Sequence, residues 1–196
     1  MTHASRSRRK VIGALAALPL FFAWGAQAAE EIPVPLELQA QLLSKVLTYD
    51  RSLATRAGDK VRLLLVGKPS DPTSMPAIRQ MRQALGALDA LGGLPHEEST
   101  LEFTNAVDLA EKTKNGRFTI VYIGPGFHGD IESIRVALEP LPVLTVSANP
   151  EDVSRGIVLG FDLVSGRPKL VLHLTQARRQ RVDLSSDVLK LMRIIE

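Results

Sequence analysis

The sequence predicts an α/β fold: a Rossmann-like three-layer sandwich whose mostly parallel sheet ends in a C-terminal antiparallel hairpin and a closing helix. Two observations lead to this prediction. Between residues 61 and 149, short and continuously apolar segments alternate with amphipathic ones, which is typical of parallel strands covered by helices on both faces. Further along, two apolar segments flank the turn sequence Ser165-Gly166-Arg167-Pro168, which indicates a hairpin.

The first elements follow from periodicity and turn signals. A helix is expected over residues 36–53, because its apolar residues fall largely along one stripe. The apolar run 61–66 is expected to be a buried strand that ends at Gly67-Lys68-Pro69. A second helix is expected over 76–91, because proline stands at the favoured first position and Gly92-Gly93 follows its end.

The middle of the domain continues the same alternation. Residues 98–103 are expected to form a strand, and a helix over 106–114 begins after a Thr-Asn pair that can cap it. The run 118–123, Phe-Thr-Ile-Val-Tyr-Ile, has the strongest strand signal of the chain. A helix with acidic residues in its first turn is expected over 130–138, and a strand over 143–146.

The C-terminal third is expected to close one edge of the sheet. Strands are predicted over 157–164 and 169–174, with Gly166 and Arg167 as a two-residue type II′ turn. In that register three apolar residues of each strand face one another on one side of the hairpin: Leu159, Phe161 and Leu163 against Leu174, Leu172 and Leu170. The final helix is expected over 186–195, with Ser185 as its cap.

The first 28 residues have the three-part layout of a secretory signal peptide. A basic segment from Arg6 to Lys10 precedes the apolar run 11–24, and Ala26-Gln27-Ala28 is a small-x-small cleavage site. The run is shorter than the ~20 residues that a membrane span needs, so an uncleaved signal anchor is the less favoured alternative. We expect cleavage between Ala28 and Ala29 and export to the periplasm by the Sec route.

The twin-arginine route is the alternative for export, because Ser7-Arg8-Arg9 loosely matches its signal. In either case residues 29–196 are expected to form one domain with no membrane span left after cleavage.

Charge and cysteine content exclude several classes of function. Four cations of the predicted signal peptide account for the basic balance, since without them 20 Lys and Arg stand against 21 Asp and Glu. No basic block lies beside interleaved aromatic residues, so we expect no nucleic-acid binding. The chain has no cysteine, which excludes disulfides, thiolate metal sites and a cysteine nucleophile. A domain of this size can hold its core by packing alone.

Catalytic and cofactor templates do not match. The chain has no Gly-x-Ser-x-Gly, Walker A or His-Glu-x-x-His sequence. The stretch Gly124 to Gly129 is similar to a phosphate loop, but Pro125 removes one of the N–H groups that an anion would use. His96-Glu97-Glu98 is interpreted as a solvated turn, because adjacent side chains of an extended segment point to opposite faces. We therefore expect no enzyme, no cofactor and no metal.

One generic site is expected from topology. Polar residues follow successive predicted strands, and the carboxyl ends of parallel strands share one rim of the sheet where ligands bind in open α/β folds. These residues are Lys68, Ser70, Thr104, Asn105, His128, Ser147 and Asn149. The alternative interpretation is that they belong to ordinary strand-to-helix turns.

Four stretches resemble a known family. They are 142–147 (Pro-Val-Leu-Thr-Val-Ser), 155–161 (Arg-Gly-Ile-Val-Leu-Gly-Phe), 167–174 and 182–195. They are similar to the YfiR-like family of exported bacterial proteins, whose best-known member is a periplasmic repressor of a membrane-bound diguanylate cyclase. The resemblance implies a compact α/β fold and a membrane signalling partner. This chain departs from the family after the first helix, where an aromatic-rich Trp-Pro is usual and this chain has Asp50-Arg51-Ser52-Leu53, and at His173, where Asn is common.

Two functions are consistent with these observations. The first is a non-enzymatic periplasmic regulator that binds and inhibits the periplasmic part of an inner-membrane signalling protein, a diguanylate cyclase or a sensor kinase. The alternative is a periplasmic small-ligand binding module that serves a sensor kinase or an outer-membrane transporter. A homodimer through the exposed hairpin edge is a further expectation, since unpaired edges invite pairing.

Overall fold

The computed structural model describes residues 1–2 and 32–196, so the predicted signal segment and the cleavage site at Ala28 and Ala29 lie outside the described residues. Seven strands form one sheet: β1 (Val61–Gly67), β2 (His96–Glu102), β3 (Ile120–Ile123), β4 (Leu144–Ser147), β5 (Leu159–Val164), β6 (Arg167–His173) and β7 (Arg193–Ile195). Their order across the sheet is β2-β1-β3-β4-β5-β6-β7. Strands β1 to β5 are parallel, β6 is antiparallel to β5, and β7 is parallel to β6.

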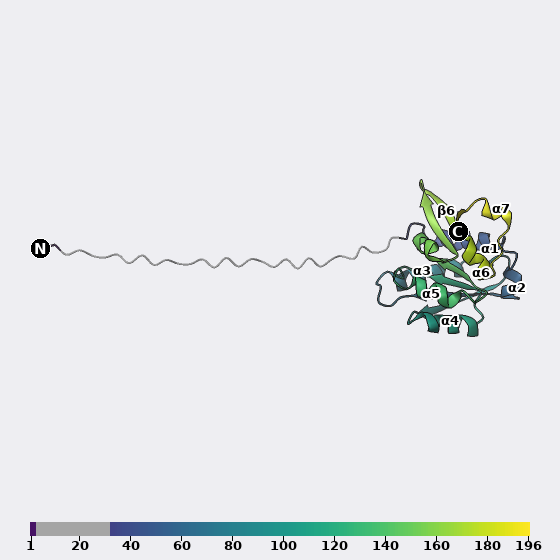
Figure 1. Cartoon of the computed structure of the whole chain (residues 1–196), viewed down its shortest axis with the longest axis horizontal. Coiled ribbons are helices and arrows are strands. Elements are labelled where there is room, and N and C mark those ends of the chain that lie inside the picture. Colours follow the sequence, from purple (N-terminus) through teal and green to yellow (C-terminus); the bar gives the residue numbers. More distant parts are fainter. Residues whose placement is uncertain (3–31) are drawn as a thin grey trace.

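Helices cover both faces of this sheet (Figure 1). They are α1 (Leu36–Leu47), α2 (Leu53–Ala57), α3 (Ser74–Gly86), α4 (Ala106–Asn115), α5 (Ile131–Leu138), the 3-10 helix η1 (Pro150–Arg155), α6 (Leu174–Arg179) and α7 (Ser186–Leu189). The predicted three-layer α/β sandwich with a C-terminal hairpin is confirmed.

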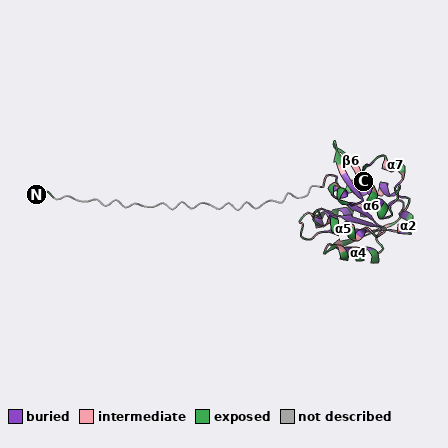
Figure 2. Cartoon of the chain, viewed as in Figure 1, coloured by how far each residue is buried: buried purple, intermediate pink, exposed green. Residues whose placement is uncertain are grey.

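Two apolar cores lie on the two sides of the sheet. On one side, α1, α2, α3, α6 and α7 pack on alternate strand residues such as Leu63, Tyr122 and Phe161. On the other side, α4 and α5 pack on the intervening residues, such as Leu64 and Val121. Figure 2 shows the sheet as buried and the outer faces of the helices as exposed. The central strands are buried on both faces, which explains why apolar residues follow one another in β1 and β3 instead of alternating with polar ones.

The single helix predicted over 36–53 is wrong, because the chain turns after Leu47 and begins α2 at Leu53. The buried residue Asp50 lies at this corner. Its carboxylate accepts hydrogen bonds from the backbone N–H and the hydroxyl of Ser52 at 2.9 and 2.6 Å, and it forms an ion pair with Arg56 of α2. The apolar stripe continues through the corner because both helices pack on the same face of the sheet.

The hairpin register differs from the predicted one by two residues. Leu159 faces Leu172 and Phe161 faces Leu170, and the two-residue turn is Ser165-Gly166. Both turn residues have positive φ, 51° and 73°, as a type I′ turn requires. Because side chains alternate with a period of two, this shift leaves the same residues on the same face.

The end of the chain also differs from prediction. The helix expected over 186–195 is a single turn, α7, after which residues 193–195 form β7 on the outer side of β6. Ser185 precedes α7 but makes no capping hydrogen bond through its side chain. Pairing with β6 decides the conformation of Arg193 to Ile195, a contact that local periodicity does not reveal. The edge of the sheet opposite β2 is therefore formed by β7 together with the outer half of β6.

Candidate functional site

The rim expected from topology lies at the carboxyl ends of β1 to β4. Lys68 and Ser70 follow β1, Thr104 and Asn105 follow β2, and His128 lies in the loop after β3. Ser147 is the last residue of β4, and Asn149 precedes η1. The chain order reverses between β1 and β3, because β1 leads to β2 on one side while β3 continues the sheet on the other. Open α/β sheets bind ligands at such a switch point.

Lys68 occupies the switch point. Its Nζ lies 2.6 Å from Oδ2 of Asp130, at the start of α5, and both side chains are roughly a quarter to a third exposed. The same Nζ lies 5.8 Å from the centre of the Phe127 ring, a cation–π contact. Phe127 is buried and stands edge-on to Phe103, with ring centroids 5.1 Å apart. A partly exposed charge pair therefore rests on an apolar support.

The loop between β1 and α3 is organised by Asp71. Its Oδ1 accepts hydrogen bonds from the backbone N–H groups of Thr73 and Ser74 at 2.8 and 3.1 Å. Desolvation acts to raise the pKa of Asp71, but the hydrogen bonds from Thr73 and Ser74 and the charge of Lys68 outweigh it, so the pKa lies below its ordinary value. Gly126 has φ +88° and faces Asp71 so closely that a Cβ there would lie 2.5 Å from Oδ2. The β1 and β3 loops are thus held against each other.

His128 and Arg155 extend the rim toward η1. Arg155 donates a hydrogen bond of 2.7 Å to the backbone carbonyl of His128, and its Nη2 lies 2.7 Å from Nε2 of the same residue. Since a guanidinium can only donate, Nε2 accepts this hydrogen bond and a proton is carried at Nδ1. Both side chains are exposed.

The other predicted rim residues serve the turns in which they lie. Ser147 and Asn149 are buried: the Ser147 hydroxyl donates to Asp152 at 2.5 Å, and the Asn149 side chain accepts from the N–H of Glu151. Asn105 caps α4 by accepting from the N–H of Asp108, and Thr104 donates to the Asp108 carboxylate. Ser70 is exposed. Lys68 and His128 are therefore the two predicted residues in the middle of an accessible rim.

Sequence reasoning missed Asp71, Asp130, Arg155 and the aromatic support. Asp130 was visible only as an acidic residue at a helix start, and Arg155 belongs to a short 3-10 helix that has no clear periodicity. The interpretation of His96 as part of a solvated turn is wrong. His96 begins β2 with a nearly buried side chain, and its two ring nitrogens contact the Glu98 carboxylate and, at 2.9 Å, the carbonyl of Leu88.

An open groove of about 610 Å³ adjoins this rim. It is lined by Pro150, Glu151, Ser154, Arg155, Asp162, Arg193, Ile194 and Ile195. Arg155 belongs to both features, so the rim and the groove form one continuous surface. Arg193 pairs with Asp162 at 2.9 Å across the groove. The part of the chain that the structure describes contains no cluster of three metal-ligating residues and no helix long and apolar enough to cross a bilayer.

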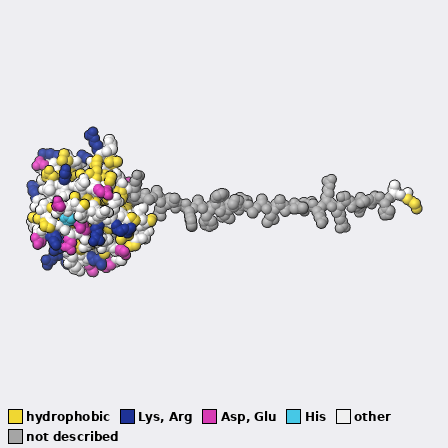
Figure 3. All heavy atoms as spheres, turned by 180° about the vertical axis from the view of Figure 1, so that it is seen from behind, with side chains coloured by type: hydrophobic (Ala, Val, Ile, Leu, Met, Phe, Trp, Pro, Cys, Tyr) yellow, Lys and Arg dark blue, Asp and Glu magenta, His cyan; other side chains and the backbone are white. Residues whose placement is uncertain are grey.

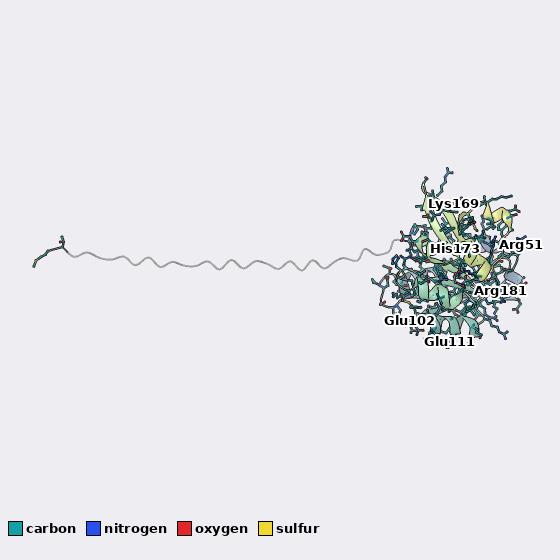
Figure 4. The ribbon with its side chains drawn as sticks, viewed as in Figure 1. Arg51, Glu102, Glu111, Lys169, His173 and Arg181 are labelled. Carbon is teal, nitrogen blue, oxygen red and sulfur yellow. The ribbon has the colours of Figure 1, made fainter. Side chains whose placement is uncertain are left out.

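His173, at the base of the hairpin, caps α6 (Figure 4). Its Nδ1 accepts a hydrogen bond of 3.4 Å from the N–H of Gln176. Desolvation lowers the pKa of His173 from its ordinary value of 6.5, and the charges of Arg179 and Arg135 act in the same direction. The folded state therefore favours the neutral imidazole.

We expect this histidine to make stability depend on pH. The pKa of His173 is lower in the folded state than in the unfolded state, so between these two values the unfolded state binds more protons. The contribution of the neutral imidazole to stability is therefore complete above about pH 6.5 and is lost as pH falls through the folded pKa. His173→Asn keeps a capping acceptor and is expected to remove this dependence. Urea unfolding of both proteins between about pH 5 and pH 8 checks it. An unchanged pH profile in the variant would contradict the assignment.

The chain has an α/β fold built on one mostly parallel seven-stranded sheet, and solved structures share this fold. It is similar to a conserved domain protein from Vibrio cholerae, with a TM-score of 0.57 and 15% identity over 83% of this chain and 60% of that one. It is also similar to the ABC domain in complex with L-Trp from Streptococcus pneumoniae, with a TM-score of 0.57 and 10% identity over 80% of this chain and 62% of that one. The chain thus spans about three fifths of each relative. A comparison with curated protein sequences finds no match.

The family model described as YfiR/HmsC-like matches residues 36–193, and the chain belongs to this family. The match covers nearly all of the described domain, from the start of α1 to the start of β7. The family comprises periplasmic, regulatory domains of diguanylate cyclase systems.

Proposed function

We propose that residues 29–196 are an exported, non-enzymatic regulator that binds the periplasmic part of an inner-membrane diguanylate cyclase and holds it inactive. The observation that carries this proposal is the match of the YfiR/HmsC-like family to residues 36–193. The predicted signal peptide supports the same compartment. A regulator of this kind needs no chemistry of its own, only a higher affinity for one state of its partner than for the other.

The rim is the surface that we propose for this contact. It presents charges of both signs, Lys68 with Asp130 and Arg155 beside His128, in side chains that remain partly or fully exposed. Charged groups at an interface contribute more to selectivity and to the association rate than to affinity. The buried Phe127 holds Lys68 in place, so the charge pattern is presented by a rigid support.

The test combines a gene deletion with surface variants. Deletion is expected to raise cellular cyclic di-GMP, and the wild-type gene is expected to restore it. The double variant Lys68→Glu and Arg155→Glu should fail to restore it, because both rim cations are reversed. The matched control, Lys112→Glu and Lys114→Glu, changes the same number of cations on α4 and should restore it fully. Cyclic di-GMP is measured by mass spectrometry, with in-cell crosslinking to identify the captured protein.

The outcomes separate the parts of the proposal. Unchanged cyclic di-GMP after deletion, together with no captured membrane protein, would refute the regulator. Restoration by the rim variant would leave the regulator in place but move its contact to another surface. Capture of a sensor kinase instead of a cyclase would identify the kinase as the partner.

A small-ligand module is the second candidate, and the groove of about 610 Å³ favours it. Because the fold-related domain from Streptococcus pneumoniae was solved with L-Trp, that amino acid is a reasonable first probe. Binding in a titration calorimeter that is lost in Arg155→Ala would support this alternative. The predicted homodimer stays a prediction, and sedimentation of the purified protein tests it.

A further inference from the structure

The hairpin formed by β5 and β6 projects beyond the rest of the domain (Figure 1). Its base is buried, with Leu159 and Phe161 of β5 and Leu172 of β6 inside the core. Every residue from 163 to 168 is exposed, and β7 pairs only with the inner half of β6. The outer end of the hairpin, residues 163–169, therefore projects from a base that is anchored in the core, and we refer to it as the hairpin tip.

Two large apolar side chains are exposed at the hairpin tip. Leu163 is 45% exposed and Val164 is 48% exposed. They are neighbours in one strand, so they point to opposite faces of the hairpin. A flat protein surface docking on one face would cover only one of them. An apolar environment that surrounds the tip from both sides would cover both.

The hairpin tip is also cationic. Arg167 faces Val164 and Lys169 faces Asp162 across the hairpin. Asp162 pairs with Arg193 of β7, and no ion pair of Arg167 or Lys169 occurs within the described residues. Figure 4 shows Lys169 on the hairpin, and Figure 3 shows Lys and Arg side chains projecting at the same end of the molecule. On a domain with nearly balanced charge, the tip thus combines apolar groups with unneutralised positive charge.

We propose that the hairpin tip docks on an anionic lipid surface. Leu163 and Val164 enter the interface from the two faces of the hairpin, while Arg167 and Lys169 remain at the level of the lipid phosphates. Apolar insertion combined with attraction to anionic headgroups is the established physical basis of reversible membrane attachment. This inference goes beyond the proposed function: it requires export but no particular protein partner.

The fold explains why such a contact is reversible. Only two apolar side chains enter the interface, and a single weak anchor gives marginal membrane binding. The two cations add an attraction that weakens as salt screens it. The contact would keep the domain close to the membrane surface, where the periplasmic part of a membrane protein is found, and so raise its effective concentration there.

The experiment uses protein purified from the periplasm, so that it has been processed as in the cell. Co-sedimentation is measured with vesicles of phosphatidylethanolamine and phosphatidylglycerol and with vesicles of phosphatidylcholine alone. The variants are Leu163→Ser with Val164→Ser, and Arg167→Glu with Lys169→Glu. The matched control is Val107→Ser with Val136→Ser, which removes two exposed valines from α4 and α5, away from the hairpin. Circular dichroism checks that each variant is folded.

Binding is expected with anionic vesicles only, and it should weaken as salt is raised. Each tip variant should lower the partition coefficient at least about tenfold, whereas the control should leave it unchanged. No binding of the folded protein to anionic vesicles would overturn the proposal, and so would equal binding of the tip and control variants. If the native protein bound no vesicles but captured a protein that the tip variants did not capture, the hairpin tip would dock in a pocket of that protein instead. The vesicle assay contains no partner, so its failure is distinguishable from failure of the regulator.

Discussion

Replacing Asp50 by Ala is expected to lower the free energy of unfolding by about 3–5 kcal/mol, because it leaves the buried guanidinium of Arg56 without its counter-charge. The Asp50 and Arg56 side chains are 0% and 3% exposed. Arg56 also donates to the carbonyl of Thr119 at 2.9 Å, just before β3. The loss would be a large fraction of the 5–15 kcal/mol typical of a domain. Urea unfolding measures it.

The chain contains a matched control for this prediction. Arg51 and Asp183 form an ion pair at 3.0 Å, but their side chains are 65% and 59% exposed. Arg51→Ala should therefore cost less than about 1 kcal/mol. The double variant Asp50→Leu and Arg56→Leu should cost much less than the sum of its single changes, since no charge is left unpaired. Equal losses for Asp50→Ala and Arg51→Ala would contradict burial of the pair.

Replacing Phe127 by Ala is expected to lower the free energy of unfolding by about 3–5 kcal/mol through the cavity that it leaves. Phe127 is 1% exposed, packs against Phe103 and lies beneath Lys68. The same change removes the support of the rim charge, so binding of a rim partner should also weaken. Urea unfolding and partner capture are measured in parallel.

Phe103→Ala is the matched control, because it removes the other ring of the pair from a position that is only partly buried. Phe103→Ala should lower the free energy of unfolding clearly less than Phe127→Ala does. Phe127→Leu keeps most of the buried volume and should lie between the native protein and Phe127→Ala. A Phe127→Ala protein with native stability would show that this ring does not fill the core.

The rim illustrates how far topology can be predicted from a sequence of this kind. The positions of Lys68 and His128 at the ends of parallel strands followed from the alternation of strands and helices alone. Their partners did not. Asp130 reaches Lys68 from a segment 62 residues away, and Arg155 reaches His128 across 27 residues. Such pairings depend on how loops from separate strands meet, which local pattern does not encode.

Short segments were the least predictable, for the same reason. Residues 193–195 have the apolar pattern of a helix end, yet they pair with β6 as β7. The turn at Ser165-Gly166 was predicted one residue too late, because Gly166 tolerates left-handed backbone in either turn type. The Asp50 corner interrupts a continuous helical stripe through a buried ion pair that only the tertiary fold completes.

The sequence by itself determined the α/β class, the alternation of buried strands with amphipathic helices, and the position of the rim, because these follow from the spacing of apolar residues. Only the tertiary structure decided the order of the strands, the partners of the rim charges, and the exposure of Leu163 and Val164 at the end of a projecting hairpin. The physical reason is that apolar spacing reports which side of an element faces the core, whereas strand order and surface exposure depend on contacts between residues distant in the chain.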